Sequence, residues 1–400
     1  MAVYEKPKAV VTDARLRIAV TIARSLGRAG IHVVAAEAAD TPRPLAFHSK
    51  YVKSSVNLGR GAKTALSDAD VETLLEAAGE GGVLVPVFTP AVFKMSWDEP
   101  KIARRAKALV PTPSALEEAH DKARCTKLAR SLGVPVPRTS SPAENGVDIR
   151  DASAMLKWAQ DLPYPVMLKY RSGEDAGLPA SLRYRMCSSP EEVLEAYRQM
   201  ETVQTAPIAQ EYVAGEDYGA ALLYDKDGRP VASFTYRSIR ERPRGAGPTV
   251  YCVSEDCPEL VDYSHRLLSA LNWRGMAMLD FRRGLDGKFR FLEVNPRFWG
   301  SLALAVEAGV DFPLLYYRAC LGEDIAPLRQ KDGVRVRFFP GDFVSLFEYS
   351  RLPGNGAGYI AKGLWDLLKY RPRDGLFSLS DPMPGLIHLT GGVFRRHARA

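Results

Sequence analysis

Short apolar runs alternate with amphipathic segments along the first hundred residues. Residues 8–14 form an apolar run typical of a buried strand. Residues 15–30 carry apolar side chains at helical spacing up to Gly30, a residue type that commonly ends helices. The strand pattern returns at residues 31–37, and a further helix and strand follow before residue 90. This alternation predicts a parallel α/β sheet.

After residue 110 the pattern changes to one typical of an α+β region. Lys122 follows Asp121 at the start of a predicted helix, and the apolar run before Lys169 predicts a strand that ends on this lysine. Ser189 is the expected N-cap of another helix. Two apolar segments on either side of residues 285–287 predict a β-hairpin, and the chain from residue 326 onward is aromatic, proline-rich and not assigned.

Composition narrows the class of protein. The 400 residues, 46% apolar and 25% charged, are typical of a soluble globular protein of two to four domains. The net charge of +7 is compatible with nucleic acid, a membrane surface or an anionic ligand. No RNA-binding signature, zinc-ligand spacing or long Lys/Arg run is present. A positive cleft for a polyanionic cofactor therefore accounts for the charge better than a nucleic-acid partner does.

Three sequence features bear on the expected cellular location: the cysteines, the N-terminus and the length of the apolar runs. Five scattered cysteines, an odd number, predict reduced and mostly buried thiols. The charged N-terminus lacks the apolar segment of a signal peptide, and no apolar run reaches the roughly 18 residues that a membrane span needs. We expect a cytoplasmic protein with no membrane span. The turn after the first strand, "TDARLR", has no glycine, so a nicotinamide or flavin site is not expected there.

The predicted hairpin gathers polar residues on one face. With its turn centred on residues 285–286 or 286–287, Asp280, Glu293 and Asn295 share a face, because strand side chains alternate. The other face would be an apolar core face, formed by Leu279, Phe281, Leu292 and Val294.

Two carboxylates and an amide oxygen this close together suit a hard divalent ion such as Mg²⁺. Arg297, just beyond, suits phosphate or carboxylate oxygens. The alternative is a solvated strand end in which Arg297 pairs with Glu293.

Two lysines and a polar turn extend this set. Lys122 and Lys169 could each hold phosphate as a point charge, or be ordinary surface lysines. In "AQEYVAGEDY", backbone groups could read a purine edge and Asp217 could accept from ribose hydroxyls. The alternative for this stretch is an ordinary hairpin.

The order of these features resembles the ATP-grasp superfamily, in its carboxylate–amine ligase and carbamoyl-phosphate-synthetase-like branch. The matching stretches include "YPVMLKYRSG", "AQEYVAGEDYGAALL" and, most specifically, "EVNPRFWGS". The resemblance implies a fold of α/β and α+β parts, in which a preATP-grasp parallel α/β domain precedes a two-lobed ATP-grasp fold. The expected divisions are a preATP-grasp (Rossmann-like) domain, an N-terminal lobe, a C-terminal lobe and an extension of unknown role, at residues 1–110, 111–205, 206–325 and 326–400.

The resemblance also implies which residues bind ATP. Lys122 and Lys169 would contact its phosphates. The adenine edge and the ribose would be contacted by Gln210, Glu211, Val213 and Asp217.

The same resemblance assigns the metal and the catalytic groups. Asp280, Glu293 and Asn295 would hold Mg²⁺ (or Mn²⁺), with Glu293 bridging two ions. Arg297 would stabilise the transferring phosphoryl group or the acyl phosphate, together with Lys169.

Two departures from the family pattern stand out. The phosphate-covering loop, glycine-rich in many relatives, has only Gly173 and Gly177 here, so its residues are not assigned. D-alanine–D-alanine-ligase-like relatives carry an arginine two positions before the first metal aspartate. That position is Met278 in this chain, which argues against a dipeptide ligase of that type.

The implied function is an ATP- and Mg-dependent ligase that activates a carboxylate as an acyl phosphate for attack by an amine or similar nucleophile. Its partners would be small-molecule carboxylate and amine substrates. Arg240, Arg242 or Arg244 could steer the substrate carboxylate; the alternative is that these arginines are solvent-exposed. The alternatives are a carboxylase or carbamoyl-phosphate-synthetase-type enzyme using carboxyphosphate, and a non-catalytic ATP-binding regulatory protein. A homodimer is a hypothesis at the level of the fold only.

Overall fold

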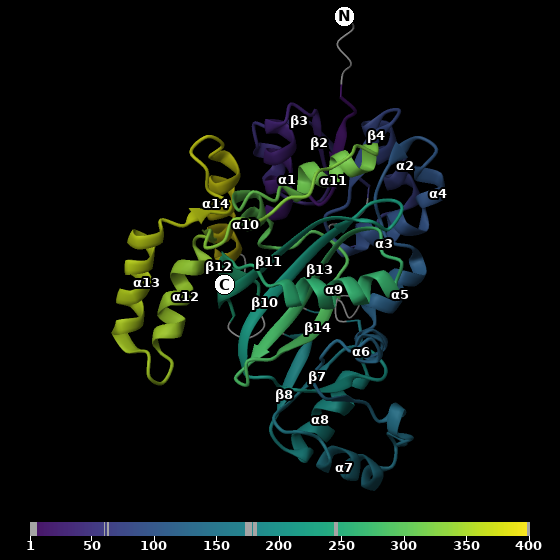
Figure 1. Cartoon of the computed structure of the whole chain (residues 1–400), viewed down its shortest axis with the longest axis vertical. Coiled ribbons are helices and arrows are strands. Elements are labelled where there is room, and N and C mark those ends of the chain that lie inside the picture. The colour runs from purple at the N-terminus through teal and green to yellow at the C-terminus, as the bar shows by residue number, and fades with distance from the viewer. Residues whose placement is uncertain are drawn as a thin grey trace, which may run out of the picture.

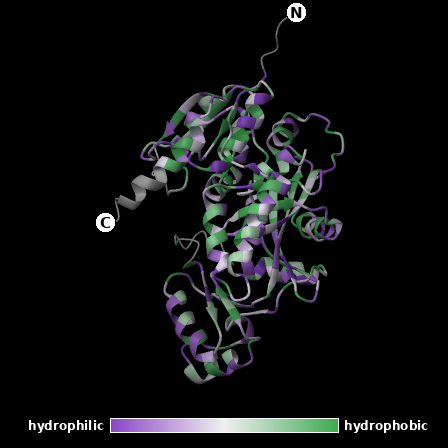
Figure 2. Cartoon of the chain, turned by 90° about the vertical axis from the view of Figure 1, so that its left-hand side faces the viewer, coloured by the Kyte–Doolittle hydropathy of each residue, from purple (hydrophilic) through white to green (hydrophobic). Residues whose placement is uncertain are grey.

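A computed structural model describes residues 6–59, 61, 64–172, 178, 182–243 and 247–397 of the chain, with side chains up to residue 390. Three β-sheets of five, seven and four strands are arranged along the long axis of the molecule, with helices between and around them (Figure 1). Figure 2 shows hydrophobic residues mixed with hydrophilic ones on the helices that cover the sheets, as expected of amphipathic elements.

The five-stranded sheet is parallel, with the order β3-β2-β1-β4-β5. It confirms the α/β sheet expected from the first hundred residues. Helix α1 does stop before Gly30, which has a φ of 75°. Sequence analysis missed β3 because this edge strand is mostly polar and exposed. The elements are β1 (Ala9–Val11), α1 (Arg17–Arg28), β2 (Val33–Ala38), η1 (Leu45–His48), β3 (Val52–Leu58), α2 (Asp68–Ala78), β4 (Gly82–Val85), α3 (Thr89–Trp97), α4 (Glu99–Ile102) and β5 (Ala106–Lys107).

The four-stranded sheet is antiparallel, with the order β6-β9-β7-β8. Helices α7 and α8 cover it, and the core between them contains Met155, Trp158 and Tyr197. Ser189 caps α8 by accepting a hydrogen bond from the Glu192 N–H, as predicted. The elements of this part are α5 (Pro113–His120), α6 (Lys122–Ser131), β6 (Thr139–Ser140), η2 (Ala143–Asn145), α7 (Ala152–Gln160), β7 (Val166–Lys169), β8 (Tyr184–Cys187), α8 (Pro190–Glu201) and β9 (Ile208–Glu211).

The seven-stranded sheet has the order β14-β13-β10-β11-β12-β15-β16. Because β9 and β10 lie in different sheets, the stretch between them is not an ordinary hairpin. The expected hairpin is present as β13 and β14. The elements are β10 (Gly215–Tyr224), β11 (Pro230–Glu241), β12 (Thr249–Ser254), α9 (Pro258–Ala270), β13 (Gly275–Gly284), β14 (Phe289–Asn295), α10 (Leu302–Glu307) and α11 (Phe312–Leu321), followed by β15 (Arg335–Arg337) and β16 (Arg373–Asp374).

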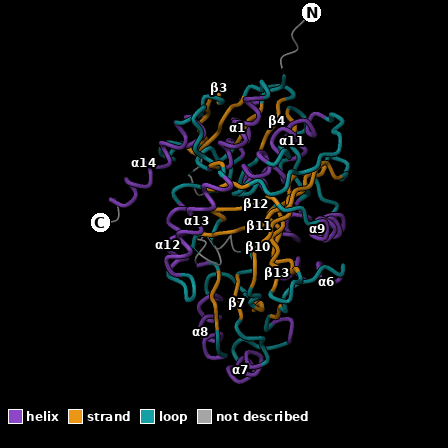
Figure 3. The backbone as a smooth tube through the Cα atoms, turned by 60° about the vertical axis from the view of Figure 1, so that its left-hand side comes forward, coloured by secondary structure: helices purple, strands orange, loops and turns teal. Residues whose placement is uncertain are grey.

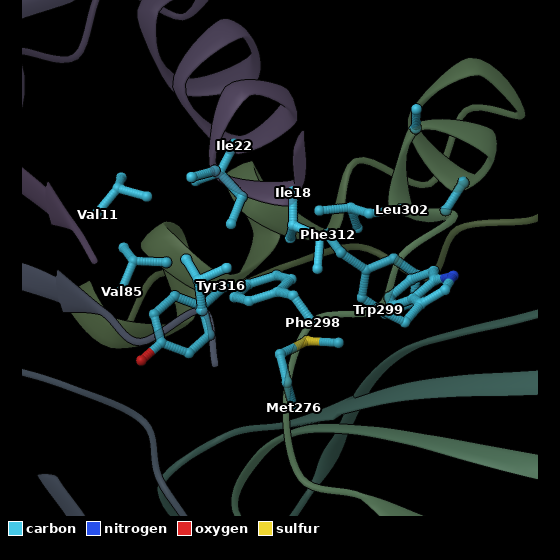
Figure 4. Close-up of a cluster of buried hydrophobic side chains, with 14 of the residues drawn as sticks. Val11, Ile18, Ile22, Val85, Met276, Phe298, Trp299, Leu302, Phe312 and Tyr316 are labelled. Atoms are coloured by element: carbon cyan, nitrogen blue, oxygen red, sulfur yellow. The ribbon is translucent and has the colours of Figure 1, made fainter. Parts of the chain in front are cut away.

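One hydrophobic cluster joins the five-stranded sheet to the seven-stranded sheet. Figure 4 shows Ile18 and Ile22 of α1 on one side, Met276 of β13 on the other, and Phe298 and Trp299 between them. Phe298 and Trp299 are 1% and 0% exposed, so the segment that follows β14 is fixed by burial on both sides.

The chain after residue 326 is integrated into the fold. It supplies β15 and β16 to the edge of the seven-stranded sheet and three helices, α12 (Gly341–Ser350), α13 (Gly356–Tyr370) and α14 (Met383–His397). Asp381 accepts hydrogen bonds from Arg24 Nε at 2.8 Å, Ser49 Oγ at 2.8 Å and the Lys50 N–H at 2.9 Å. These bonds tie the C-terminal segment to α1 and to the segment before β3.

Two sequence expectations concern the state of the thiols and the presence of a membrane span. All five cysteines are free, and three of them are buried. Among the helices in the described part of the chain, none is long and apolar enough to cross a membrane.

Replacing Asp381 by Ala should destabilise the protein by about 3–5 kcal/mol, because the Arg24 guanidinium would be left buried without its carboxylate. The midpoint of urea unfolding measures this loss. Asp227→Ala is the matched control, since it removes an exposed carboxylate paired with Lys226 and should leave the midpoint almost unchanged. Equal midpoints for the two variants would contradict a structural role for the Asp381 network.

Candidate active site

The β13–β14 hairpin brings the two expected carboxylates face to face. Asp280 is paired with Glu293 in the antiparallel register, and Asn295 Nδ2 donates a hydrogen bond to Asp280 Oδ2 at 2.8 Å. The register shifts between Asp280 and Phe281, so Leu292 is an extra residue on β14. The predicted apolar face is therefore wrong at one position, since Leu292 is half-buried and lines a cavity with Glu293 instead of joining the core.

The two carboxylates titrate in opposite directions. Lys122, foremost, lowers the pKa of Glu293 to about 2, and Lys169 and Arg297 act the same way. Burial, followed by the negative charge of Glu293, raises the pKa of Asp280 to about 8. At neutral pH without a further cation, Glu293 is ionised and Asp280 is mostly protonated.

The cation nearest Glu293 comes from the start of α6. Lys122 Nζ lies 2.9 Å from Glu293 Oε2. Asp121 caps α6 by accepting from the N–H groups of Ala123 and Arg124, and its carboxylate also pairs with Arg171 at 2.5 Å. The cap fixes the first turn of the helix and thereby the direction of Lys122.

The second lysine lies at the end of β7, as predicted. Lys169 Nζ donates to Gln210 Oε1 at 2.7 Å, and Gln210 Nε2 donates to Thr139 Oγ1 at 3.2 Å. Burial lowers the pKa of Lys169 to about 8, against the opposing effect of Glu293. A chain of side-chain hydrogen bonds across the four-stranded sheet thus holds this ammonium group.

Asp217 has a partner that sequence reasoning missed. Arg282 on β13 stands opposite Asp217 on β10, with Nη2 at 2.5 Å from Asp217 Oδ1, and its Nη1 donates to the Val213 carbonyl at 3.4 Å. Only the register between β10 and β13 reveals this pair. Glu211 carries a looser ion pair with the exposed Arg138 at 3.3 Å.

A further carboxyl group, Glu241, was also missed. It ends β11 and lines the same cavity as Asp217. Burial, with Asp217 next, raises the pKa of Glu241 to about 9. No sequence signal marks it, because its proximity to Asp217 arises only when β11 lies beside β10 in the sheet.

Arg297 is held by hydrogen bonds to its own chain neighbours and to Thr89 of the first sheet's domain. Its Nε donates to Thr89 Oγ1 at 3.1 Å, its Nη1 to the Phe298 carbonyl at 3.1 Å and its Nη2 to Asn295 Oδ1 at 3.3 Å. The guanidinium also lies 5.4 Å from the centre of the Phe88 ring. The arginine therefore stands where the carboxylate hairpin meets the five-stranded sheet.

A single cavity of about 520 Å³ contains all the expected site residues in its wall. Its other end is lined by residues of the first hundred, which sequence reasoning did not assign to the site: Leu16, Ile18, Phe88 and Thr89. These follow β1 and β4 at the carboxyl edge of the parallel sheet, the usual place for ligands in such sheets. The expected residues that line the cavity are Lys122, Lys169, Gln210, Glu211, Val213, Asp217, Asp280, Glu293, Asn295 and Arg297.

The arginines expected to steer a substrate carboxylate need correction. Arg240 is 3% exposed and forms a buried ion pair with Asp342 of α12 at 2.5 Å, so it serves the fold. Arg242 pairs with Glu348 of the same helix at 3.0 Å. Arg244 lies outside the described residues, as do residues 173–177 and 179–181 of the expected phosphate-covering loop.

The donor set suits a hard divalent cation. Two carboxylates and one amide share the end of the hairpin. Burial, and then the charge of Glu293, raise the pKa of Asp280, and a bound cation would offset both effects. Within the described residues no cluster of three or more His, Cys, Asp or Glu side chains is placed to hold a metal. Any Mg²⁺ here would therefore take part of its ligand shell from phosphates and water, as this ion usually does.

Comparison with known proteins supports the ATP-grasp resemblance. Residues 206–340 match the family model of an ATP-grasp in the biosynthetic pathway with Ter operon. The solved biotin carboxylase domain of Hydrogenobacter thermophilus 2-oxoglutarate carboxylase, in complex with MgADP and bicarbonate, has a similar fold at a TM-score of 0.61 and 18% identity, over 82% of this chain and 72% of that one. Residues 206–340 thus match an ATP-grasp family, and the similar solved structure confirms the mixed α/β fold that the sequence suggests.

Curated relatives of this chain are distant in sequence. A D-alanine–D-alanine ligase of Pseudomonas fluorescens (strain Pf0-1) is 26% identical over 44% of this chain and 53% of its own length. D-alanine–D-alanine ligase B of Pseudomonas putida (strain KT2440) is 24% identical over 82% of this chain and 93% of its own. The match thus spans about half the length of the first of these relatives, and activity and substrates are matters for proposal.

The pH dependence of nucleotide binding should report on Lys169. Its ammonium group loses its proton as the pH rises through about 8, so affinity for ADP should fall several-fold between pH 7.5 and 9.5, where an ordinary lysine stays mostly charged. Lys169→Arg keeps its charge throughout this range and should show a smaller fall. Isothermal titration calorimetry at a series of pH values measures both proteins.

Asp280 and Glu241 lose protons in the same range, so the difference between the two proteins, not the slope of either, isolates Lys169. Parallel curves for the wild type and Lys169→Arg would show that Lys169 does not titrate there or does not contact the nucleotide.

Proposed function

We propose that the chain is an ATP- and Mg²⁺-dependent ligase that phosphorylates a carboxylate and joins the resulting acyl group to an amine or a similar nucleophile. The observation that carries this proposal is the shared cavity. Lys122, Lys169 and Arg297 bring three cations to one carboxylate, Glu293, and the same space continues to Phe88 and Thr89 of the first sheet. The relatives, named as ligases, and the MgADP complex of a similar fold support it.

One set of cavity residues would bind the nucleotide. Gln210, Glu211 and Val213 would lie along adenine, and Asp217, fixed by Arg282, would accept from the ribose hydroxyls. Lys122 and Lys169 would bind the phosphates as point charges. The nucleotide would therefore run from β9 and β10 toward the carboxylate hairpin.

The phosphoryl group would be transferred between these lysines and Arg297. The substrate carboxylate attacks the γ-phosphorus, the bond to the β-phosphate oxygen breaks, and ADP leaves as the acyl phosphate forms. Arg297, held by Thr89 and Asn295, would stabilise the charge on the transferred group through its planar fork. Mg²⁺ held by Asp280, Glu293 and Asn295 would supply charge neutralisation at the β- and γ-phosphates.

The nucleophile would enter from the side of the first sheet. It attacks the acyl carbon, the new bond to nitrogen forms, and phosphate leaves. No covalent enzyme nucleophile is needed, so positioning and electrostatic stabilisation would supply the rate. Met278 lines the cavity where dipeptide ligases of the D-alanine type carry an arginine, which favours a different substrate pair from that of the curated relatives.

A second candidate is ATP-dependent formation of carboxyphosphate from bicarbonate. The bicarbonate bound to the biotin carboxylase domain of similar fold favours it, since Arg297 could hold that anion equally well. The homodimer and the cytoplasmic location remain predictions; the dimer is supported only by the dimeric state of that same domain.

Glu293→Gln should lower ATP-dependent acyl phosphate formation by about 1,000-fold or more, because the variant loses the carboxylate charge that would hold Mg²⁺ in the site. The assay supplies Mg-ATP with pools of carboxylates and traps acyl phosphates as hydroxamates with hydroxylamine. Glu216→Gln is the matched control: it lies on the same sheet, is half exposed and should keep full activity.

The outcomes separate the candidates. A hydroxamate that requires one carboxylate supports the ligase, and phosphate release that requires bicarbonate alone supports the carboxyphosphate reaction. Nucleotide binding with no phosphate release from any pool would favour a regulatory protein. Full activity of Glu293→Gln would overturn the metal assignment.

A further inference from the structure

Helices α12 and α13 form a pair at the edge of the molecule. In Figure 1, α12 adjoins the seven-stranded sheet and α13 lies on its outer side, and Figure 3 shows both helices beside this sheet from another side. Tyr359 of α13 stacks on Tyr349 of α12 at 5.9 Å between ring centres, and Gly363 lies against Leu346. Gly363 is the one buried residue of α13, so this helix contacts the protein along a single narrow face.

The opposite side of α13 is apolar and exposed. Leu364 is 45% exposed, Trp365 63% and Leu368 70%, and helical spacing places all three on the side away from Gly363 and Tyr359. On α12, Phe343 and Phe347 are each 42% exposed and lie one turn apart, with their rings 5.2 Å from each other. Large apolar side chains gathered in this way on a surface mark a binding site.

The most exposed charged residues around this surface are cations. Among residues 341–374, the five most exposed charged residues are all cations, and the four acidic residues are less exposed, although the Glu348 side chain is still 39% exposed. Asp342 and Glu348, two of these acids, are already paired with Arg240 and Arg242. The exposed cations are Arg351, Lys362, Lys369, Arg371 and Arg373, of which Arg373 pairs with Glu307.

Two of these cations border the apolar side of α13. Lys362 and Lys369 lie about one turn before and one turn after Trp365, and so flank its ring along the helix. A helix with Trp and Leu on one side and lysines beside them is typical of helices that lie in the interface of a lipid bilayer. At 15 residues α13 is shorter than a membrane span, so it would lie along the surface.

We propose that the α12–α13 pair binds the surface of an anionic lipid bilayer, with Leu364, Trp365 and Leu368 inserted among the acyl chains and the lysines at the headgroups. Charge complementarity selects this occupant over a second copy of the chain. A two-fold contact through this surface would bring the same cations of both copies together, which is unfavourable.

Vesicle co-sedimentation of the full chain tests the proposal. The protein should sediment with vesicles of phosphatidylcholine mixed with phosphatidylglycerol, bind much less to phosphatidylcholine alone, and lose binding as salt rises. Lys362→Gln with Lys369→Gln should lower the partition coefficient about 30-fold, since two headgroup contacts are lost. Trp365→Ser with Leu368→Ser should abolish binding.

Controls keep folding and insertion apart. Leu285→Ser removes an 89% exposed leucine from the β13–β14 turn and should bind like the wild type. All changed residues are exposed, so urea unfolding midpoints should agree. Trp365→Phe should keep the partition coefficient and lose the blue shift of tryptophan fluorescence that insertion causes, which places the contact at this residue.

Two results would overturn the proposal. The first is that the wild type does not bind anionic vesicles, or that Trp365→Ser with Leu368→Ser binds them as well as the wild type does. The other is a homodimer, detected by light scattering, that this double variant dissociates while neither protein binds vesicles, because the surface would then be an interface between copies.

Discussion

Two carboxylates that face each other in a partly buried site cannot both stay ionised unless cations surround them, and this constraint organises the molecule around Asp280 and Glu293. The cations come from separate elements: Lys122 from the start of α6, Lys169 from the four-stranded sheet and Arg297 from the segment after β14. The site therefore exists only where the seven-stranded and four-stranded sheets meet. Folding of either part alone would leave an incomplete set of charges.

Hydrophobic packing, in addition to charge, fixes the position of Arg297 in the site. Phe298 and Trp299 follow Arg297 directly and are buried between the first sheet and β13 (Figure 4). Their burial fixes the backbone position of Arg297 relative to both. Its hydrogen bond to Thr89 adds a polar contact to the same sheet. The hydrophobic cluster thus fixes the carboxylate hairpin relative to the end of the cavity that the first sheet lines.

The sequence predicts features that depend on one strand or one helix, and fails where the register between distant strands decides. Strand alternation placed Asp280, Glu293 and Asn295 on one face, and an apolar run placed Lys169 at a strand end. Arg282 and Glu241 could not be found, because their neighbour Asp217 lies on another strand, 65 residues from Arg282 along the chain.

The errors have the same physical origin. An extra residue on β14 turned Leu292 toward the cavity, and nothing in its alternating neighbours signals this shift. Arg240 has the sequence context of a surface arginine, yet it is buried because Asp342, 102 residues later, pairs with it. That pair belongs to α12, whose Tyr349 hydroxyl also accepts a hydrogen bond from the Glu241 N–H at 3.1 Å. The α12–α13 pair therefore contacts the strand end that carries Glu241, a residue of the cavity wall.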